Sequence, residues 1–211
     1  MSKEDFKKCR NTNYPCCTVI GIYTIIITSS HLPKQKEYFV IMIALQITSM
    51  KNFMNQLLAS DTFDIFLMEE AVISTSNTVT IDGHMNKDFF AAQDSASEAS
   101  GETCPYDLAL WSEKRSLCFN LIKGKRTPLF FKFVLHLKPE QLEKLLLRDD
   151  CGVDPSLLSA MVLTIKYDGQ KAVLTTGIAY NSFVMTKDPD KLWDRTVTKY
   201  LADRGISFEE L

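Results

Sequence analysis

The stretch LFFKFVLHLKPEQLEKLLLR, residues 129–148, and the stretch MVLTIKYDGQKAVLTTG, residues 161–177, together decide the fold. The first begins with an apolar run that predicts a buried strand, and Pro139 then stands at the start of a helix. Leucines at three- and four-residue spacing give this helix one apolar face. In the second stretch, β-branched residues flank Asp168-Gly169, a pair that favours a hairpin turn. The two stretches therefore predict a strand, a helix and a hairpin in that order.

The same order of elements occurs earlier, in residues 43–83. The segment IALQI, residues 43–47, is typical of a strand, and a β-rich segment precedes a second Asp-Gly pair, Asp82-Gly83, which predicts a turn. Between this strand and the β-rich segment, apolar residues recur at a helical period and so predict a helix with one apolar face. These residues are Met50, Phe53, Met54, Leu57 and Leu58. The two units share the order of their secondary-structure elements, while their sequence identity is weak. We therefore expect an α+β fold of duplicated strand-helix-hairpin units, which build two antiparallel sheets with helices packed on one side.

Two further helices are expected outside these units. One spans residues 107–123, and the other is capped by Asp188 with Pro189 just inside it. The apolar stripe of the last helix consists of Leu192, Trp193, Val197, Tyr200 and Leu201. Residues 92–104 are small, polar and acidic, and they predict a mobile loop within the domain.

Composition and charge are those of an ordinary globular protein. The chain has 211 residues, of which 45% are apolar, and its net charge is −2. This balance does not indicate nucleic-acid or membrane binding by bulk charge, although it leaves room for a local basic face. The cysteines form no C-x-x-C pair and no regular spacing, so we expect neither a disulfide framework nor a zinc site. The pattern favours a reducing, cytoplasmic location, and no cofactor motif is present.

The first 41 residues differ from the rest of the chain. Four basic residues precede the apolar run TVIGIYTIIIT, residues 18–28, an order that resembles a signal peptide. The run is shorter than the roughly 20 residues of a membrane-spanning helix. Three interpretations stay open: a non-native extension translated from an upstream start, a signal or anchor, and a structured extension. Residues 42–211 would then form a single α+β domain with no expected membrane contact.

The repeated unit resembles the processivity-fold domain of DNA sliding clamps. The resemblance rests on the order of elements in the second unit, FVLHLKPEQLEKLL followed by LTIKYDGQKAVLTTG, and not on a sequence motif. It covers roughly 130 of the 170 residues after Met42, counted by element order. Because clamp rings contain six such domains, the resemblance implies that this chain would have to oligomerise to form a ring.

Residues 42–211 also resemble an uncharacterised bacterial family, a domain of unknown function found in Gram-positive gut bacteria. Three segments carry this resemblance: DTFDIFLMEEAVISTSNTVTIDG at residues 61–83, NKDFF at residues 86–90, and FNLIKGKRTPLFFK at residues 119–132. Members of the family tend to begin near the equivalent of Met42, which favours the upstream-start interpretation. The resemblance implies no function and no site residues.

The sequence contains no recognisable catalytic constellation. It has no G-x-S-x-G, P-loop, G-x-G-x-x-G or H-E-x-x-H motif, and its three histidines cannot be grouped with a nucleophile and an acid. His136 lies within an apolar strand, where a hydrogen-bonded structural role is usual. Clustered carboxylates can hold Mg²⁺, but carboxylates at turns also serve the local backbone. The candidates are Asp61, Asp64, Glu69, Glu70 and Asp82.

A basic cluster runs from the predicted helix at residues 107–123 into the segment that follows it. Its members are Lys114, Arg115, Lys123, Lys125 and Arg126, and Trp111 and Phe119 lie nearby. Such a cluster can contact phosphates, although cations are also favoured at helix C-termini.

Three functional hypotheses follow. The first is a non-catalytic binding module, clamp-like in shape, that contacts nucleic acid or a nucleic-acid-processing protein through the basic cluster. The second is a protein–protein adaptor or a homo-oligomer that uses the edges of its hairpins. The third is a metal-dependent enzyme that uses the carboxylate cluster. The absence of a catalytic motif favours the binding hypotheses.

Overall fold

The computed structural model describes residues 40–89, 105–149, 152–184 and 186–211, and the side chains from residue 43 onward. The predicted extension, up to residue 39, and the predicted loop at 92–104 lie outside the described residues. All described elements belong to the compact unit Lys36–Leu211. In chain order they are β1 (Val40–Ile47), α1 (Met50–Leu58), β2 (Phe66–Ser74), β3 (Thr78–Asp82), β4 (Ala109–Leu110), α3 (Trp111–Ile122), β5 (Phe130–Leu137), α4 (Pro139–Arg148), a 3-10 turn (Pro155–Leu157), β6 (Leu158–Tyr167), β7 (Ala172–Tyr180), α5 (Asp188–Asp203) and β8 (Phe208–Glu210).

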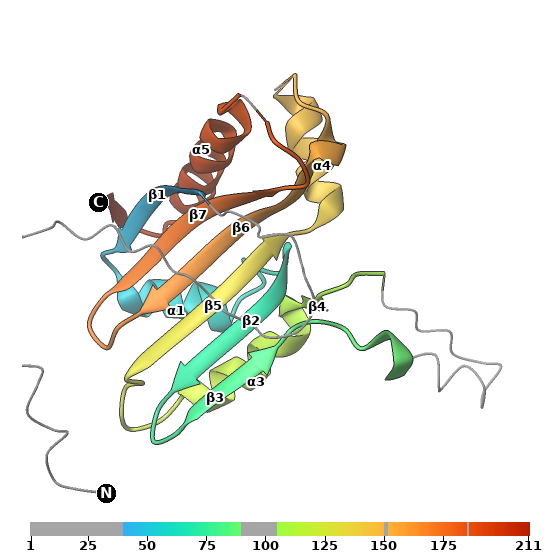
Figure 1. The fold of residues 1–211 in the computed structure, drawn as a ribbon. Helices are drawn as coiled ribbons and strands as arrows, with labels where there is room; N and C mark the ends of the chain where they lie inside the picture. The colour runs from blue at the N-terminus through green and yellow to red at the C-terminus, as the bar shows by residue number, and fades with distance from the viewer. Residues whose placement is uncertain (1–39, 90–104, 150–151, 185) are drawn as a thin grey trace, which may run out of the picture. The chain divides into compact units, whose positions relative to one another are not determined.

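The strands form one antiparallel sheet, so the α+β class is confirmed and the expectation of two sheets is wrong (Figure 1). The strand order is β3-β2-β5-β6-β7-β1-β8, and the short β4 pairs with β2. In the second unit, β5 pairs directly with β6, whereas in the first unit β1 and β2 are separated by β5, β6 and β7. The two units therefore share an order of elements but not a pattern of strand pairing.

The helices pack on one face of this sheet. Strand β5 shows the alternation that makes this possible, because Phe131, Phe133 and Leu135 are buried in the main core while Lys132 and His136 are half-buried on the opposite face. Apolar residues from α1, α3, α4 and α5 join the same core. A second, small buried group occupies the opposite face: Val134, Ala160, Val162 and Ala179.

Both tryptophans are anchored in the core by hydrogen bonds as well as by packing. The Trp111 indole N–H of α3 donates to the Leu57 carbonyl at the end of α1, at 3.2 Å. The Trp193 indole N–H of α5 donates to the Val162 carbonyl of β6, at 2.9 Å. A buried indole with a satisfied N–H fixes the position of its helix on the layer beneath. These contacts therefore hold α3 against α1 and α5 against the sheet.

Gly83 does not form the predicted turn. The β2–β3 hairpin is closed by residues 75–77, and Gly83 instead follows β3 and lies against the backbone of β2. Its N–H donates to the Glu69 carbonyl at 2.8 Å, beside an irregularity in the β2–β5 register between Met68 and Glu70. A β-carbon at position 83 would lie 1.8 Å from the Met68 carbonyl oxygen. Glycine is therefore required here for close approach and not for a turn.

The other predicted elements differ from the structure mainly at their ends. The helix expected over 107–123 begins at Trp111, because residues 109–110 pair with β2. The Asp168-Gly169 turn is confirmed: Gly169 has φ +95°, and the Asp168 carboxylate accepts hydrogen bonds from two following N–H groups. No helix in the described part of the chain combines the length and apolar composition needed to span a bilayer.

Candidate ligand-binding groove

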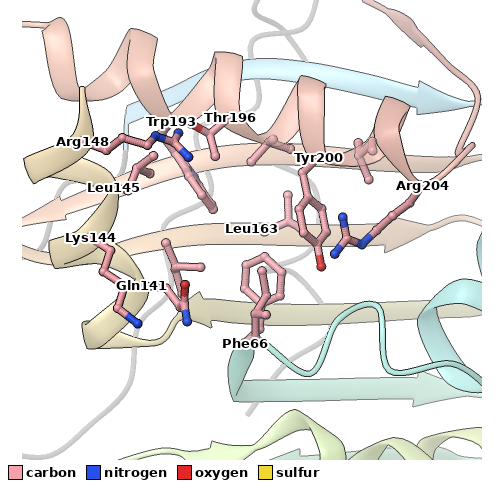
Figure 2. A pocket seen from close by; sticks show the side chains of 14 residues that line it. Phe66, Gln141, Lys144, Leu145, Arg148, Leu163, Trp193, Thr196, Tyr200 and Arg204 are labelled. Atoms are coloured by element: carbon pink, nitrogen blue, oxygen red, sulfur yellow. The ribbon is translucent and has the colours of Figure 1, made fainter.

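A cavity of about 440 Å³ opens between α4 and α5, above the sheet. Figure 2 shows that α4 forms one wall and α5 the other. Its lining residues come from four parts of the chain: Ile65, Phe66, Leu137, Gln141, Lys144, Leu145, Arg148, Leu163, Trp193, Thr196, Val197, Tyr200, Leu201 and Arg204. We call this cavity the α4–α5 groove.

The floor of the groove is apolar because three strands turn their core-facing residues toward it. Phe66 of β2, Leu137 of β5 and Leu163 of β6 are all buried, and Phe66 and Leu163 lie at the centre of the view in Figure 2. The Trp193 ring lies against Phe66 with ring centroids 6.4 Å apart. A concave apolar surface with a few polar groups at its edge is typical of a small-molecule site.

The rim of the groove is cationic. Lys144 and Arg148 lie on α4 at a spacing of four residues, and Arg204 caps the C-terminal end of α5. The lining set contains no Asp or Glu, although the whole chain carries a net charge of −2. Positive charge is therefore concentrated around an apolar cavity in a slightly acidic protein.

The three cations differ in how they are held. Arg148 donates from Nε and an Nη to the neighbouring Asp149 at 3.1 and 3.0 Å. Within the described residues, Lys144 and Arg204 have no carboxylate oxygen within 4.0 Å of their charged nitrogens. Arg204 instead places its guanidinium 3.8 Å from the centroid of the Tyr200 ring.

Tyr200 ties the α5 wall to the loop between α1 and β2. Its hydroxyl donates to the Thr62 carbonyl, and Thr62 is itself buried. Burial raises the pKa of the Tyr200 hydroxyl, while the nearby Arg204 opposes the shift. The phenol therefore stays protonated at neutral pH, and its ring gives Arg204 a fixed surface.

Five of the fourteen residues that line this groove were predicted from the sequence to face inward, but not as parts of a site. Leu145, Trp193, Val197, Tyr200 and Leu201 were expected to face inward from two amphipathic helices, and the structure confirms that they do. The cations were not singled out, because each is an unremarkable charge near a helix end. The i, i+4 spacing of Lys144 and Arg148 was the available signal, but it gains meaning only once α4 and α5 are known to be neighbours.

The structure separates the predicted basic cluster into two groups. Lys123, the residue after α3, and Lys125 and Arg126 in the following loop are exposed. Lys114 and Arg115 lie earlier on α3, roughly 13 Å from Lys123 at 1.5 Å of rise per residue. The cluster therefore does not form a single continuous patch at the end of the helix.

Arg115 has a structural environment. Its Nη1 donates to the Ser60 carbonyl and to the Asp64 carboxylate, the latter at 2.7 Å. The Arg115 and Asp64 side chains are only 22% and 28% exposed. Arg115 thus fixes the same α1–β2 loop that Tyr200 reaches from the other side.

Four of the five clustered carboxylates pair with four different residues. Asp64 binds Arg115, and Glu70 of β2 pairs with Lys132 of β5 at 2.5 Å. Across the described residues, no three histidine, cysteine or acidic side chains are grouped so that they could hold a metal ion. The five carboxylates that the sequence offers as candidates for a metal site are Asp61, Asp64, Glu69, Glu70 and Asp82.

The histidine and cysteine environments are structural. His136 Nε2 lies 2.6 Å from Glu69 Oε2, and this hydrogen bond lowers the pKa of the Glu69 carboxyl. His84 Nδ1 lies 2.6 Å from Asp82 Oδ1. Burial raises the pKa of the Cys118 thiol to about 12, so Cys118 is a core residue and not a reactive thiolate.

Comparison with known proteins places the chain in a family. Residues 56–209 match the model of the Family of unknown function (DUF5721). The chain belongs to this family. The DUF5721 match runs from α1 to β8 and so includes both helices of the α4–α5 groove. No curated protein and no solved structure was found to match the chain.

Proposed function

We propose that this DUF5721 protein is a non-catalytic binding module, and that its α4–α5 groove takes an organic anion with an apolar body. One observation carries the proposal: the groove has an apolar floor, three cationic side chains at its rim and no carboxylate in its lining. Its volume of about 440 Å³ falls in the range of roughly 300–1,000 Å³ that is usual for small-molecule sites.

The floor and the rim contribute different parts of this recognition. Burial of apolar ligand surface supplies most of the binding free energy, at about 25 cal/mol per Å². The cations are solvent-exposed, so each ion pair with a ligand adds at most about 1 kcal/mol. We therefore expect apolar surface to set the affinity and charge to set the selectivity.

The test compares two dyes that share one apolar body. Anilinonaphthalene sulfonate carries a negative charge, and phenylnaphthylamine is its neutral counterpart; both fluoresce more strongly in apolar surroundings. We expect the anionic dye to bind the full chain up to about fivefold more tightly than the neutral dye, because its single charge can form one exposed ion pair. If both dyes bind with equal affinity, the cations do not contribute to recognition. If neither dye shows saturable binding, the proposal is contradicted.

Two tryptophan substitutions on α5 tell the groove apart from other apolar surfaces. Thr196 faces into the groove in Figure 2, and Thr196→Trp should fill part of the cavity and weaken dye binding. Lys199 is exposed and does not line the groove, so Lys199→Trp is the matched control and should leave binding unchanged. Equal loss in the two variants would place the dye elsewhere.

A second candidate function is contact with single-stranded nucleic acid at the loop after α3. The observation that favours it is Lys123 Nζ, 5.5 Å from the ring centroid of Phe119, which is itself 41% exposed. An exposed ring beside cations is the arrangement on which bases stack while phosphates pair. Lys125 and Arg126 extend the positive surface, whereas Arg115 is engaged elsewhere and is left out of this interface.

Fluorescence anisotropy with single-stranded DNA across a salt series tests this candidate. We expect Lys123→Glu with Arg126→Glu to abolish low-salt binding or to reduce the salt slope by about 1.4, at about 0.7 per phosphate contact. The control is Lys191→Glu with Lys199→Glu on α5, which makes the same change in net charge away from the loop. If both pairs weaken binding equally, the effect comes from net charge and the loop is excluded.

An adaptor or homo-oligomeric role stays a prediction. Light scattering of the purified chain measures it directly, because a dimer doubles the mass of 24.0 kDa. A clamp-like ring gains no support from the single continuous sheet.

A further inference from the structure

We propose that the ligand of the α4–α5 groove is a linear dianion, with one acidic group held by Lys144 and the other by Arg204. The inference rests on the proposed function and adds to it the number and placement of the ligand's charges. It follows from three features of the groove: where the cations lie, which of them already have a carboxylate partner, and how Arg204 is held.

Lys144 and Arg204 lie on opposite walls. Lys144 projects from α4, and Arg204 follows the last residue of α5. In Figure 2 they stand on either side of Phe66 and Leu163, which belong to the apolar floor. A ligand that reached both cations would have to cross this floor. Its two charges must therefore be separated by an apolar segment.

The remaining rim cation, Arg148, already has a carboxylate partner. Asp149 accepts hydrogen bonds from Arg148 and from Arg195, the latter at 3.1 Å, so two cations share one carboxylate. Lys144 and Arg204 have no comparable partner in the described parts of the chain. Among the described residues, Lys144 and Arg204 are thus the rim cations without a carboxylate oxygen within 4.0 Å, and they lie one on each wall.

Arg204 is positioned before a ligand arrives. Its guanidinium rests 3.8 Å from the centroid of the Tyr200 ring, and the Tyr200 hydroxyl is anchored to the Thr62 carbonyl. Stacking on an aromatic face leaves the edge N–H groups of a guanidinium available to a carboxylate. The C-terminal end of a helix also favours a cation at this position. Ordering of Arg204 before binding lowers the entropic cost of holding an anion there.

A ligand with one charge leaves one of the two cations without a partner. A ligand with an acidic group at each end satisfies both and still covers the apolar floor. The two ion pairs, one at Lys144 and one at Arg204, lie on separate walls. Their contributions to the binding free energy should therefore add, so that their effects on the binding constant multiply. This predicts a dependence on charge number that a single anion-binding point cannot produce.

The experiment measures displacement of anilinonaphthalene sulfonate from the full chain by dodecanedioate, by its monomethyl ester and by its dimethyl ester. The three compounds share one carbon chain and differ only in charge. We expect the diacid to bind up to about fivefold more tightly than the monoester, because it can form one more exposed ion pair. A series of diacids from hexanedioate to hexadecanedioate should show an optimum in length, set by the distance between the two walls.

Substitutions assign the two ends. Lys144→Gln and Arg204→Gln should each reduce the ratio of diacid to monoester affinity to about one, because either change leaves a single anion-binding wall. Lys199→Gln removes an exposed cation of α5 outside the groove and should leave the ratio unchanged. All three positions are exposed, and thermal unfolding of each variant confirms that folding is retained.

The outcomes separate this inference from the function on which it rests. If the dye binds but the diacid and the monoester displace it equally, the two-ended ligand is overturned and the binding of a single anion stands. If the ratio survives both Gln substitutions, the two walls are not the anion sites and the inference is also overturned. If the dye itself does not bind, the proposed function falls as well.

Discussion

Replacing Gly83 with alanine should destabilise the fold by about 3 kcal/mol or more. The new β-carbon would lie 1.8 Å from the Met68 carbonyl oxygen and 2.7 Å from the Met68 carbonyl carbon. These are backbone atoms of β2, so no side-chain rotation relieves the overlap. Gly83 cannot move away easily either, because its carbonyl accepts a hydrogen bond from the Ala109 N–H at 2.8 Å and its N–H donates to Glu69. Urea denaturation of the two proteins measures the difference in the free energy of unfolding.

Gly124→Ala is the matched control. A β-carbon at Gly124 would find its nearest neighbour at 3.8 Å, and this glycine does not have a positive φ. We expect a change of no more than about 0.5 kcal/mol. A loss below about 1 kcal/mol for Gly83→Ala would show that the end of β3 can separate from β2 at little cost.

Replacing Arg115 with alanine should cost about 2–3 kcal/mol of stability. The substitution removes two charge-assisted hydrogen bonds, to the Ser60 carbonyl and to Asp64, and leaves a carboxylate that is mostly buried without its cation. The loop that these bonds hold also receives the Tyr200 hydroxyl at Thr62. We therefore expect Arg115→Ala to weaken dye binding in the α4–α5 groove although Arg115 does not line it.

Arg126→Ala provides the comparison for Arg115. Both changes remove one arginine charge, but Arg126 is exposed in the loop after α3. Its loss should change the free energy of unfolding by no more than about 0.5 kcal/mol. If nucleic-acid binding occurs, Arg126→Ala should weaken it and Arg115→Ala should not. The reverse result would contradict the structural role assigned to Arg115.

Local patterns in the sequence predicted the individual elements well. The leucine spacing of α4, the apolar stripe of α1 and the Asp168-Gly169 turn all depend on interactions between residues close in the chain. Periodicity and turn chemistry report such interactions directly. The same patterns indicated the α+β class, because the predicted helices are accompanied by hairpins, which form antiparallel strands.

The pairing of the strands could not be predicted in this way. Strand β1 pairs with β7 and β8, so its partners come from the far end of the chain. Nothing in the alternation of β1 specifies which edge it joins, and the repeated order of elements suggested two sheets where there is one. Gly83 was misjudged for the same reason, since the close approach to Met68 is a contact between strands and leaves no local signature.

The α4–α5 groove was missed because its two walls lie far apart in sequence. Each helix showed an apolar stripe that predicts burial, and a stripe that lines a cavity has the same periodicity as one that fills a core. Lys144 and Arg204 are 60 positions apart in the numbering and belong to different helices. Their relation becomes visible only when both helices are placed on the sheet.

The position of β1 between β7 and β8 has a consequence for synthesis of the chain. The Ile43 N–H donates to the Thr176 hydroxyl, 133 residues further along. A ribosome that adds about 5–20 residues per second leaves β1 without its partner strands for several seconds or more. Helix α5 and strand β8 follow β7 in the chain, so this wall of the groove and the β8 edge of the sheet are made after β7. The proposed ligand of the α4–α5 groove could therefore bind a nascent chain only after α5 has been made, which is later than the partner strand β7 of β1.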